Sequence, residues 1–174
     1  MICADPSQAM LDQLPGDPAL MPVRASAQDI AKRLVTFPAD RLNVIVIKEA
    51  IHHVPASDRQ AVLRGLTGLL APGGRIVIVM LPARIEYPLF TTALADIAAM
   101  LYCAGMETAV TYESYERSLG KDRYASMVRN RYMSLLATFT DAEIENGITE
   151  IPERHPGDHL EFADRFAFIR GIRA

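Results

Sequence analysis

The sequence predicts an open, doubly wound α/β sheet, and three observations lead to this fold class. Two runs rich in β-branched residues, 42–47 and 75–81, are almost continuously apolar, which is typical of parallel strands buried on both faces. The segment between them carries apolar residues at helical spacing, so the three form a strand–helix–strand unit. Strands and helices alternate over the rest of the chain, and no linker divides residues 1–174 into two domains.

The N-terminal elements are short. Residues 1–4 are predicted to form a strand that ends at Asp5. The proline that follows disfavours helix at the residue before it, and Ser7 is then a natural helix N-cap. A second strand is expected over 21–25, with a helix over 29–34 after it.

The central helix and the later elements follow from periodicity and capping. Ser57 and Gln60 have the spacing of a capping box, and Pro72-Gly73-Gly74 is predicted to end the helix that they open. A second capping box, Thr140 with Glu143, predicts a helix that ends at Gly147. The remaining predictions are a helix over 89–101, a strand over 108–115, a helix over 123–136 and a C-terminal antiparallel strand over 162–172.

Composition excludes several classes of protein. The 174 residues carry a net charge of -3 and are 50% apolar, so the chain lacks the basic excess of a nucleic-acid-binding protein. The most apolar later stretch, 89–105, contains Asp96 and is shorter than the roughly 20 residues that span a membrane. Cys3 and Cys103 match no metal or redox spacing, and no signal-peptide pattern begins the sequence. We expect a cytoplasmic protein without nucleic-acid or membrane partners.

Polar side chains follow two of the predicted strands. Asp5 ends the first, and an acidic residue at a strand's carboxyl end can accept hydrogen bonds from ribose hydroxyls; the alternative is that it only begins a turn. Lys48, Glu49, His52 and His53 follow the strand over 42–47, where ligands of open α/β sheets bind. Histidine transfers protons near neutral pH, although a packing or loop hydrogen-bond role is the alternative for both histidines.

Three segments, taken together, resemble class I S-adenosylmethionine-dependent methyltransferases of the small-molecule type (methyltransferase type 11-like). They are Asp5-Pro6-Ser7 with Met10-Leu11, then His52-His53-Val54, then Leu69 to Gly74 (Leu-Leu-Ala-Pro-Gly-Gly). The resemblance covers residues 1 to about 82, and more loosely 131–136 and 162–171. It implies a Rossmann-like fold and S-adenosylmethionine as cofactor.

The resemblance also implies roles for particular residues. Asp5 would bind the cofactor's ribose, beside Ser7, and Ser26, Ala27 and Gln28 would border the adenine. The family often has aspartate at the position of Ser26, so a charged contact to the adenine amine is weakened here. Lys48 and Glu49 would flank the methionine end or the substrate. No catalytic residue is obligatory, with Glu49, His52 and His53 as candidates, and no metal is expected.

The family's first strand and glycine-rich loop do not occur before Asp5, although they should lie about 20 residues upstream. That strand is central, so its removal opens a gap of roughly 9.6 Å with costly unsatisfied backbone groups. We therefore expect an N-terminally truncated domain, either a fragment or a misassigned start. In a compact monomer the flanking strands should pair directly; otherwise another chain supplies a strand, including by self-association through the free edges.

The methyl acceptor should bind in residues 82–136. A basic cluster there alternates with tyrosines, which suits an anionic or aromatic small molecule; the alternative is a solvated helix face anchored by the tyrosines. The cluster comprises Arg117, Lys121, Arg123, Arg129 and Arg131 with Tyr112, Tyr115, Tyr124 and Tyr132. His155 and His159 have the spacing of a helical metal pair, but Pro156 and Gly157 argue against a helix there.

The sequence thus predicts an enzyme that transfers a methyl group from S-adenosylmethionine to a small molecule, although the missing loop puts the activity of this chain alone in doubt. The alternative is a non-catalytic remnant or partner subunit with a methyltransferase-like fold. A nicotinamide-dependent reductase is the third hypothesis, and the histidine pair and the Leu-Leu-Ala-Pro-Gly-Gly segment argue against it.

Overall fold

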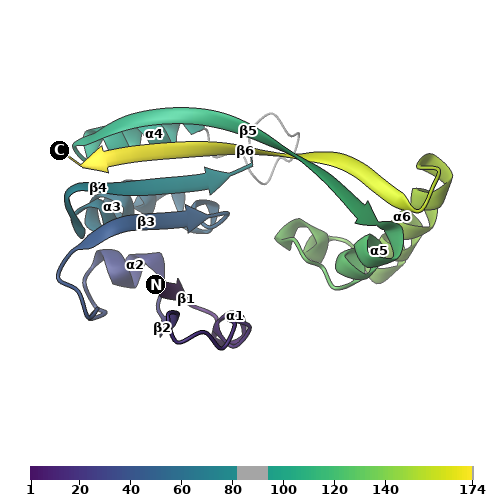
Figure 1. Cartoon of the computed structure of the whole chain (residues 1–174), viewed down its shortest axis with the longest axis horizontal. Helices are drawn as coiled ribbons and strands as arrows, with labels where there is room; N and C mark the ends of the chain where they lie inside the picture. Colours follow the sequence, from purple (N-terminus) through teal and green to yellow (C-terminus); the bar gives the residue numbers. More distant parts are fainter. Residues whose placement is uncertain (82–93, 174) are drawn as a thin grey trace. The chain divides into compact units, whose positions relative to one another are not determined.

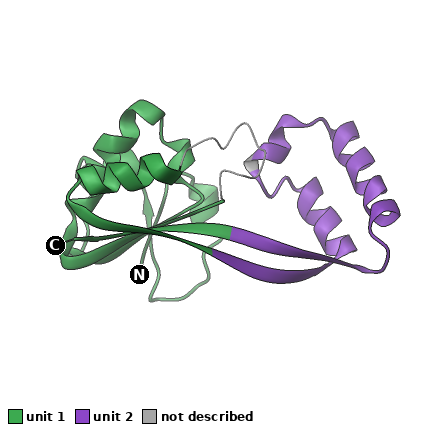
Figure 2. Ribbon diagram, turned by 90° about the horizontal axis from the view of Figure 1, so that it is seen from above, with its two compact units in different colours: residues 1–112, 166–174 green, residues 113–165 purple. Residues whose placement is uncertain are grey.

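The computed structural model describes residues 1–81 and 94–173 (Figure 1). The chain divides into two compact units, coloured separately in Figure 2. Unit 1 comprises Met1–Tyr112 with Phe166–Ala174, and unit 2 comprises Glu113–Arg165. Within the described residues no helix is long and apolar enough to cross a membrane.

The first strands of unit 1 form a two-stranded parallel sheet. Strand β1 (Ile2–Asp5) pairs with β2 (Met21–Arg24) from Ile2 opposite Met21 to Asp5 opposite Arg24. Helix α1 (Gln8–Leu11) lies between them in sequence, and α2 (Ala27–Ala31) follows β2. The two predicted strands are therefore confirmed, while the first helix is shorter than its apolar spacing suggested.

A separate four-stranded sheet has the order β3-β4-β6-β5. Its strands are β3 (Leu42–Lys48), β4 (Leu70–Met80), β5 (Met106–Gly120) and β6 (His159–Arg173). Strands β3 and β4 are parallel, and β6 runs antiparallel to β4. The predicted α/β class, with its C-terminal antiparallel strand, is confirmed.

The core of unit 1 lies on one face of this sheet. Helix α3 (Ala56–Thr67) connects β3 to β4, and α4 (Leu94–Cys103) precedes β5; both lie behind the strands in Figure 1. Leu63 of α3, Ile97 of α4 and the β4 residues Ile76 and Ile78 are completely buried in one apolar cluster. Successive strand side chains point to opposite faces, so the alternate β4 residues Ile76 and Ile78 face these helices. Leu89, Phe90 and Ala93 of the predicted helix over 89–101 lie outside the described residues.

The expected direct pairing of the strands flanking the missing strand is wrong. Among the described residues β1 pairs only with β2, and β3 pairs only with β4 on its other edge. The helices account for this, because α2 packs closely against α3: a Cβ atom on Gly65 would lie 2.6 Å from the Ala31 carbonyl oxygen. This contact fixes the β1–β2 pair through α2 without requiring a hydrogen bond to β3.

Two predicted features of α3 are also wrong. Pro55, not Ser57, is its N-cap residue; Ser57 donates to the Asp58 carboxylate, and Gln60 donates to the Met100 carbonyl. The helix ends at Thr67, before the Pro72-Gly73-Gly74 segment, because Leu70 already pairs with Leu42 of β3. The segment instead forms an irregularity within β4, with φ of 71° at Gly73.

Unit 2 comprises the end of β5, the start of β6 and the helices between them. They are α5 (Lys121–Arg129), the 3-10 helix η3 (Ser134–Thr138) and α6 (Asp141–Arg154). The predicted Thr140–Glu143 capping box is confirmed: the Thr140 Oγ1 accepts from the Glu143 amide at 3.3 Å, and the Glu143 carboxylate accepts from the Thr140 amide at 2.7 Å. Gly147 lies inside α6, so the predicted helix end there is wrong.

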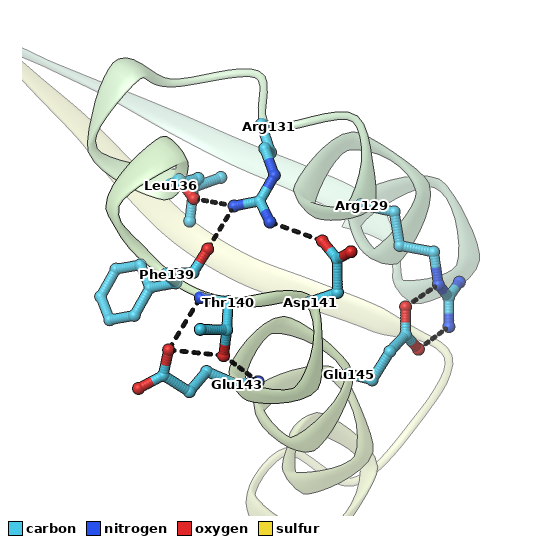
Figure 3. A network of polar contacts seen from close by, with 8 residues as sticks. All are labelled: Arg129, Arg131, Leu136, Phe139, Thr140, Asp141, Glu143 and Glu145. Atoms are coloured by element: carbon cyan, nitrogen blue, oxygen red, sulfur yellow. Dashed lines mark hydrogen bonds and ion pairs between the residues drawn. The ribbon is translucent and has the colours of Figure 1, made fainter.

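Arg131 explains why the predicted helix over 123–136 is interrupted. Its backbone is left-handed, with φ of 51°, and its guanidinium donates to the carbonyls of Leu136 and Phe139 and to the Asp141 carboxylate (Figure 3). One side chain therefore ties the end of α5 to the start of α6. A periodicity argument cannot foresee such a long-range polar contact.

Candidate functional site

Asp5 lies where the sequence predicts a ribose-binding acid, at the carboxyl end of β1. Its side chain is half-buried, and Oδ1 accepts a hydrogen bond from the Ser7 amide at 2.7 Å. Ser7 occupies the N-cap position of α1, but its side chain makes no capping bond. The turn that was the alternative role for Asp5 is thus present, and it uses only one of the two carboxylate oxygens.

Ser26 lies next to Asp5, because the Ala25 amide donates to the Asp5 carbonyl. Its hydroxyl accepts from the Asp29 amide at 3.1 Å and donates to the Asp29 carboxylate at 2.6 Å, so Ser26 and Asp29 form the capping box of α2. These hydrogen bonds hold the pKa of Asp29 below its ordinary value. Ala27 and Gln28 are half-buried in the first turn of the same helix.

Glu49 has the most unusual environment of the predicted residues. It follows β3 with a left-handed backbone, φ 47°, and its amide donates to the Val79 carbonyl at 2.9 Å. Burial raises the pKa of the Glu49 carboxyl, against the opposing effects of the Leu81 amide and the Lys48 charge. Its Oε1 is buried and has no hydrogen-bond partner among the described residues. Strain and an unsatisfied carboxylate oxygen at a strand end are typical of functional sites.

Lys48 lies near an aromatic ring of β6. The side chain is exposed, and its Nζ lies 6.0 Å from the centre of the Phe166 ring in β6. Because Lys48 is the last residue of β3 and Phe166 belongs to β6, the ammonium group lies over the carboxyl-end region of the sheet.

The two histidines form a short 3-10 helix, η1 (Ile51–His53), just beyond Glu49. Their ring centres are 4.1 Å apart. Burial lowers the pKa of His52, and the nearby charges of His53 and Arg59 lower it further. Arg59 donates to the carbonyls of Val54 and His52, which fixes this loop. A mainly neutral His52 at physiological pH is able to accept a proton.

The structure therefore brings the predicted residues together in two groups. Asp5, Ser7 and Ser26 to Gln28 lie at the end of the β1–β2 pair, and Lys48, Glu49, His52 and His53 lie at the end of β3. The sequence interpretation missed Asp29 and Arg59. The Ser-x-x-Asp spacing could have revealed Asp29, whereas nothing in the local pattern around Arg59 signals its contacts.

The basic cluster of unit 2 is largely engaged within that unit. Arg117 pairs with Asp164 at 3.1 Å, Arg129 with Glu145 at 2.8 Å and Arg131 with Asp141 at 2.7 Å, while Lys121 donates to the His155 carbonyl. Figure 3 shows the contacts of Arg129 and Arg131. Because these cations are paired within the unit, they support a solvated helix face more than an anion-binding acceptor pocket. The wider acceptor region over 82–136 stays a prediction.

Comparison with known proteins finds a family match for the N-terminal part of the chain. Residues 1–78 match the family model of the methyltransferase domain. This segment contains Asp5, Ser7, Ser26 to Gln28, Lys48, Glu49 and both histidines of η1. A search of curated proteins finds no match.

Solved structures show the same fold over nearly the whole chain. The YcgJ protein of Bacillus subtilis matches with a TM-score of 0.60 and 17% identity, over 99% of this chain and 81% of that one. An S-adenosylmethionine-dependent methyltransferase from Archaeoglobus fulgidus matches with a TM-score of 0.57 and 14% identity, over 98% of this chain and 75% of that one. Precorrin 8w decarboxylase from Methanobacterium thermoautotrophicum matches with a TM-score of 0.55 and 11% identity, over 98% of this chain and 68% of that one. At these identities the similarity concerns the fold. Residues 1–78 thus match the model of a methyltransferase domain, and the chain shares the fold of these solved structures.

Proposed function

We propose that this protein transfers a methyl group from S-adenosylmethionine to a small-molecule acceptor. The observation that carries the proposal is the pair of half-buried carboxylates, Asp5 and Glu49, that follow parallel strands within the segment matching the methyltransferase domain. Ligands of open α/β sheets bind beyond the carboxyl ends of the strands.

These residues fit the chemistry of the cofactor. Asp5 has a carboxylate oxygen outside its turn, which can accept hydrogen bonds from ribose hydroxyls. Glu49 has a buried oxygen without a partner among the described residues, and a carboxylate there suits the positively charged methionine end. Ala27 and Gln28 would border the adenine, while the Ser26 hydroxyl stays within its capping box.

When bound, S-adenosylmethionine would supply its methyl group to the acceptor's nucleophile, with S-adenosylhomocysteine as the leaving group. The protein's part is then to hold and align the two partners. If the nucleophile carries a proton, a nearby group must accept it. His52, whose lowered pKa keeps its imidazole neutral, and Glu49, whose raised pKa makes its carboxylate more basic, are the candidates.

Calorimetric titration with S-adenosylhomocysteine, the product form of the cofactor, tests the proposal. We expect Asp5→Ala to weaken binding by at least about 1 kcal/mol, roughly fivefold, because it removes charge-assisted hydrogen bonds to the ribose. Absence of heat with ligand at about 1 mM would exclude cofactor binding by this chain.

Asp17→Ala is the matched control. Asp17 Oδ1 accepts from the amide two residues later, Ala19, at 2.8 Å, just as Asp5 Oδ1 accepts from the Ser7 amide at 2.7 Å. Both variants lose the same kind of turn, and only one loses the proposed ribose contact. Equal affinities for the two variants would remove Asp5 from the site.

A non-catalytic partner subunit with the same fold is the second candidate. The observation that favours it is the separation of the β1–β2 pair from β3, which leaves the two groups of site residues on different sheets. Tight binding of S-adenosylhomocysteine by the isolated chain would argue against this role.

A further inference from the structure

Three arginine side chains converge on the carboxyl end of helix α3. The carbonyl oxygen of Gly68, the residue after this helix, accepts hydrogen bonds from Arg33 Nη2 at 3.4 Å, Arg41 Nη1 at 2.7 Å and Arg173 Nη1 at 3.3 Å. The three residues come from distant parts of unit 1: Arg33 follows α2, Arg41 precedes β3 and Arg173 ends β6. The fold therefore places three positive charges around one oxygen atom.

The positive charge at this point exceeds what the helix end can balance. A helix carboxyl end carries about half an elementary negative charge, so a single arginine is enough to compensate it. Arg64 in the last turn of α3 adds a fourth cation. We call Arg33, Arg41, Arg64 and Arg173 the arginine cluster. Because the whole chain has a net charge of -3, this positive charge is a local concentration rather than a general property of the protein.

No carboxylate neutralises the arginine cluster within residues 1–81 and 94–173. The ion pairs of this part of the chain all belong to unit 2 and involve Arg117, Arg129, Arg131 and Arg154. The contacts with Gly68 occupy one nitrogen of each of three guanidinium groups, and each guanidinium carries five N–H donors. Donors and positive charge are therefore left over for an anionic ligand.

A hollow of about 360 Å³ adjoins the arginine cluster. Arg64 and Arg173 line it together with Thr67 and Gly68 at the end of α3. Residues 104–106 (Ala-Gly-Met), where α4 ends and β5 begins, complete the lining. The hollow therefore combines guanidinium groups with small and apolar side chains, which suits a molecule that has a charged head and an organic body.

The chemistry of the arginine cluster indicates its ligand. Guanidinium groups bind phosphate oxygens through paired N–H donors, and several of them together suit a group with more than one negative charge. We propose that the arginine cluster binds a small molecule that carries a diphosphate or several phosphate groups, with its organic part in the adjoining hollow. The convergence of the cations on a single carbonyl favours a compact soluble ligand, because a membrane surface or a nucleic-acid backbone spreads its charge.

The arginine cluster lies at the opposite end of the sheet from the candidate cofactor-binding residues of β3. Strands β3 and β4 begin beside it, since Leu42 and Leu70 are their first residues and Arg173 donates to the Leu70 carbonyl at 2.7 Å. Lys48 and Glu49, by contrast, lie at the carboxyl end of β3. In Figure 1 strand β6 ends beside the starts of β4 and β5, away from the arrowheads of β3 and β4. The inference thus concerns a second site and does not rest on the proposed function.

Calorimetric titration of the chain with inorganic pyrophosphate tests the inference, at low ionic strength because salt screens exposed charges. Arg33→Gln and Arg41→Gln each remove one cation from an exposed position. We expect each to weaken pyrophosphate binding at least about fivefold through the loss of charge-assisted hydrogen bonds. Arg123→Gln, at an exposed arginine of α5, is the matched control and should bind pyrophosphate as tightly as the parent does.

Thermal unfolding separates ligand binding from the structural role of the same arginines. Pyrophosphate should raise the thermal midpoint of the parent and of Arg123→Gln, because a ligand that binds only the folded state stabilises it. The rise should be smaller in Arg33→Gln and Arg41→Gln. Each variant is compared with its own ligand-free midpoint, so the loss of a carbonyl contact does not enter the comparison.

Three results would overturn the inference. The first is the absence of heat with pyrophosphate at about 10 mM. The second is equal pyrophosphate affinity of the parent, Arg33→Gln and Arg41→Gln. The third is binding of the chain to phosphatidylcholine vesicles that contain phosphatidic acid without binding of pyrophosphate, which would identify a lipid head group as the ligand.

Discussion

Glu49 combines partial burial, a left-handed backbone and a carboxylate oxygen that has no hydrogen-bond partner in the described part of the chain. Burial raises the pKa of the carboxyl above its ordinary value of 4.5, so the folded state favours the neutral form. The stabilising contribution of the neutral carboxyl is therefore fully present below pH 4.5. It is lost as the pH rises through the raised pKa, because the buried carboxyl then ionises. A residue kept at such a cost is a candidate for function.

Glu49→Gln should therefore stabilise the protein at neutral pH, because the amide cannot ionise. We expect its thermal midpoint to exceed that of the parent at neutral pH and the difference to vanish below pH 4.5. Glu107→Gln, at an exposed glutamate of β5, is the control. Its thermal midpoint should equal that of the parent both at neutral pH and below pH 4.5. A Glu49→Gln variant that is less stable than the parent at neutral pH would show that the carboxylate has an ionic partner.

A glycine in α3 determines how closely two helices approach. A Cβ atom at Gly65 would lie 2.6 Å from the Ala31 carbonyl oxygen and 2.7 Å from the Ala31 Cβ. Gly147, inside the exposed helix α6, has no atom within 4 Å of the same position. The two positions thus separate helix propensity from packing.

Gly65→Ala should destabilise unit 1 by roughly 1–3 kcal/mol, because α2 must move away from α3. Gly147→Ala should instead stabilise α6 by about 0.5–1 kcal/mol, since alanine restricts the unfolded chain at no steric cost. Chemical denaturation monitored by circular dichroism measures both changes. Equal shifts of the same sign in the two variants would contradict the packing argument.

At the scale of the element, α6 shows how well a local pattern can predict structure. Its Thr140–Glu143 capping box was visible in the sequence and is formed by hydrogen bonds between residues three apart. The similar pair Ser57 and Gln60 forms no box, because Gln60 instead donates to Met100 of α4. The same motif therefore succeeds or fails according to the tertiary partners available.

Thr140→Ala should weaken α6 by about 1 kcal/mol, because the amide of Glu143 loses its acceptor. Thr149→Ala is the control, since the Thr149 hydroxyl only donates to the Glu145 carbonyl within the helix. Hydrogen exchange in the first turn of α6 should accelerate in the Thr140 variant alone. Unchanged exchange there would mean that the Arg131 contacts suffice to hold the helix start.

At the scale of the whole molecule, the open arrangement of unit 1 is the dominant feature. The strand order β3-β4-β6-β5 and the separate β1–β2 pair leave the proposed cofactor-binding residues at the ends of two sheets.

The sequence by itself determined the α/β class, most strands, and the family resemblance over residues 1 to about 82, because these depend on local hydrophobic pattern and on short motifs. It also placed Asp5 and Glu49 at strand ends. Only the tertiary structure decided that β1 and β3 stay apart, that Ser26 is committed to a helix cap, and that Arg131 breaks a predicted helix. These outcomes depend on contacts between residues distant in sequence or on competition for a shared partner, which periodicity does not encode.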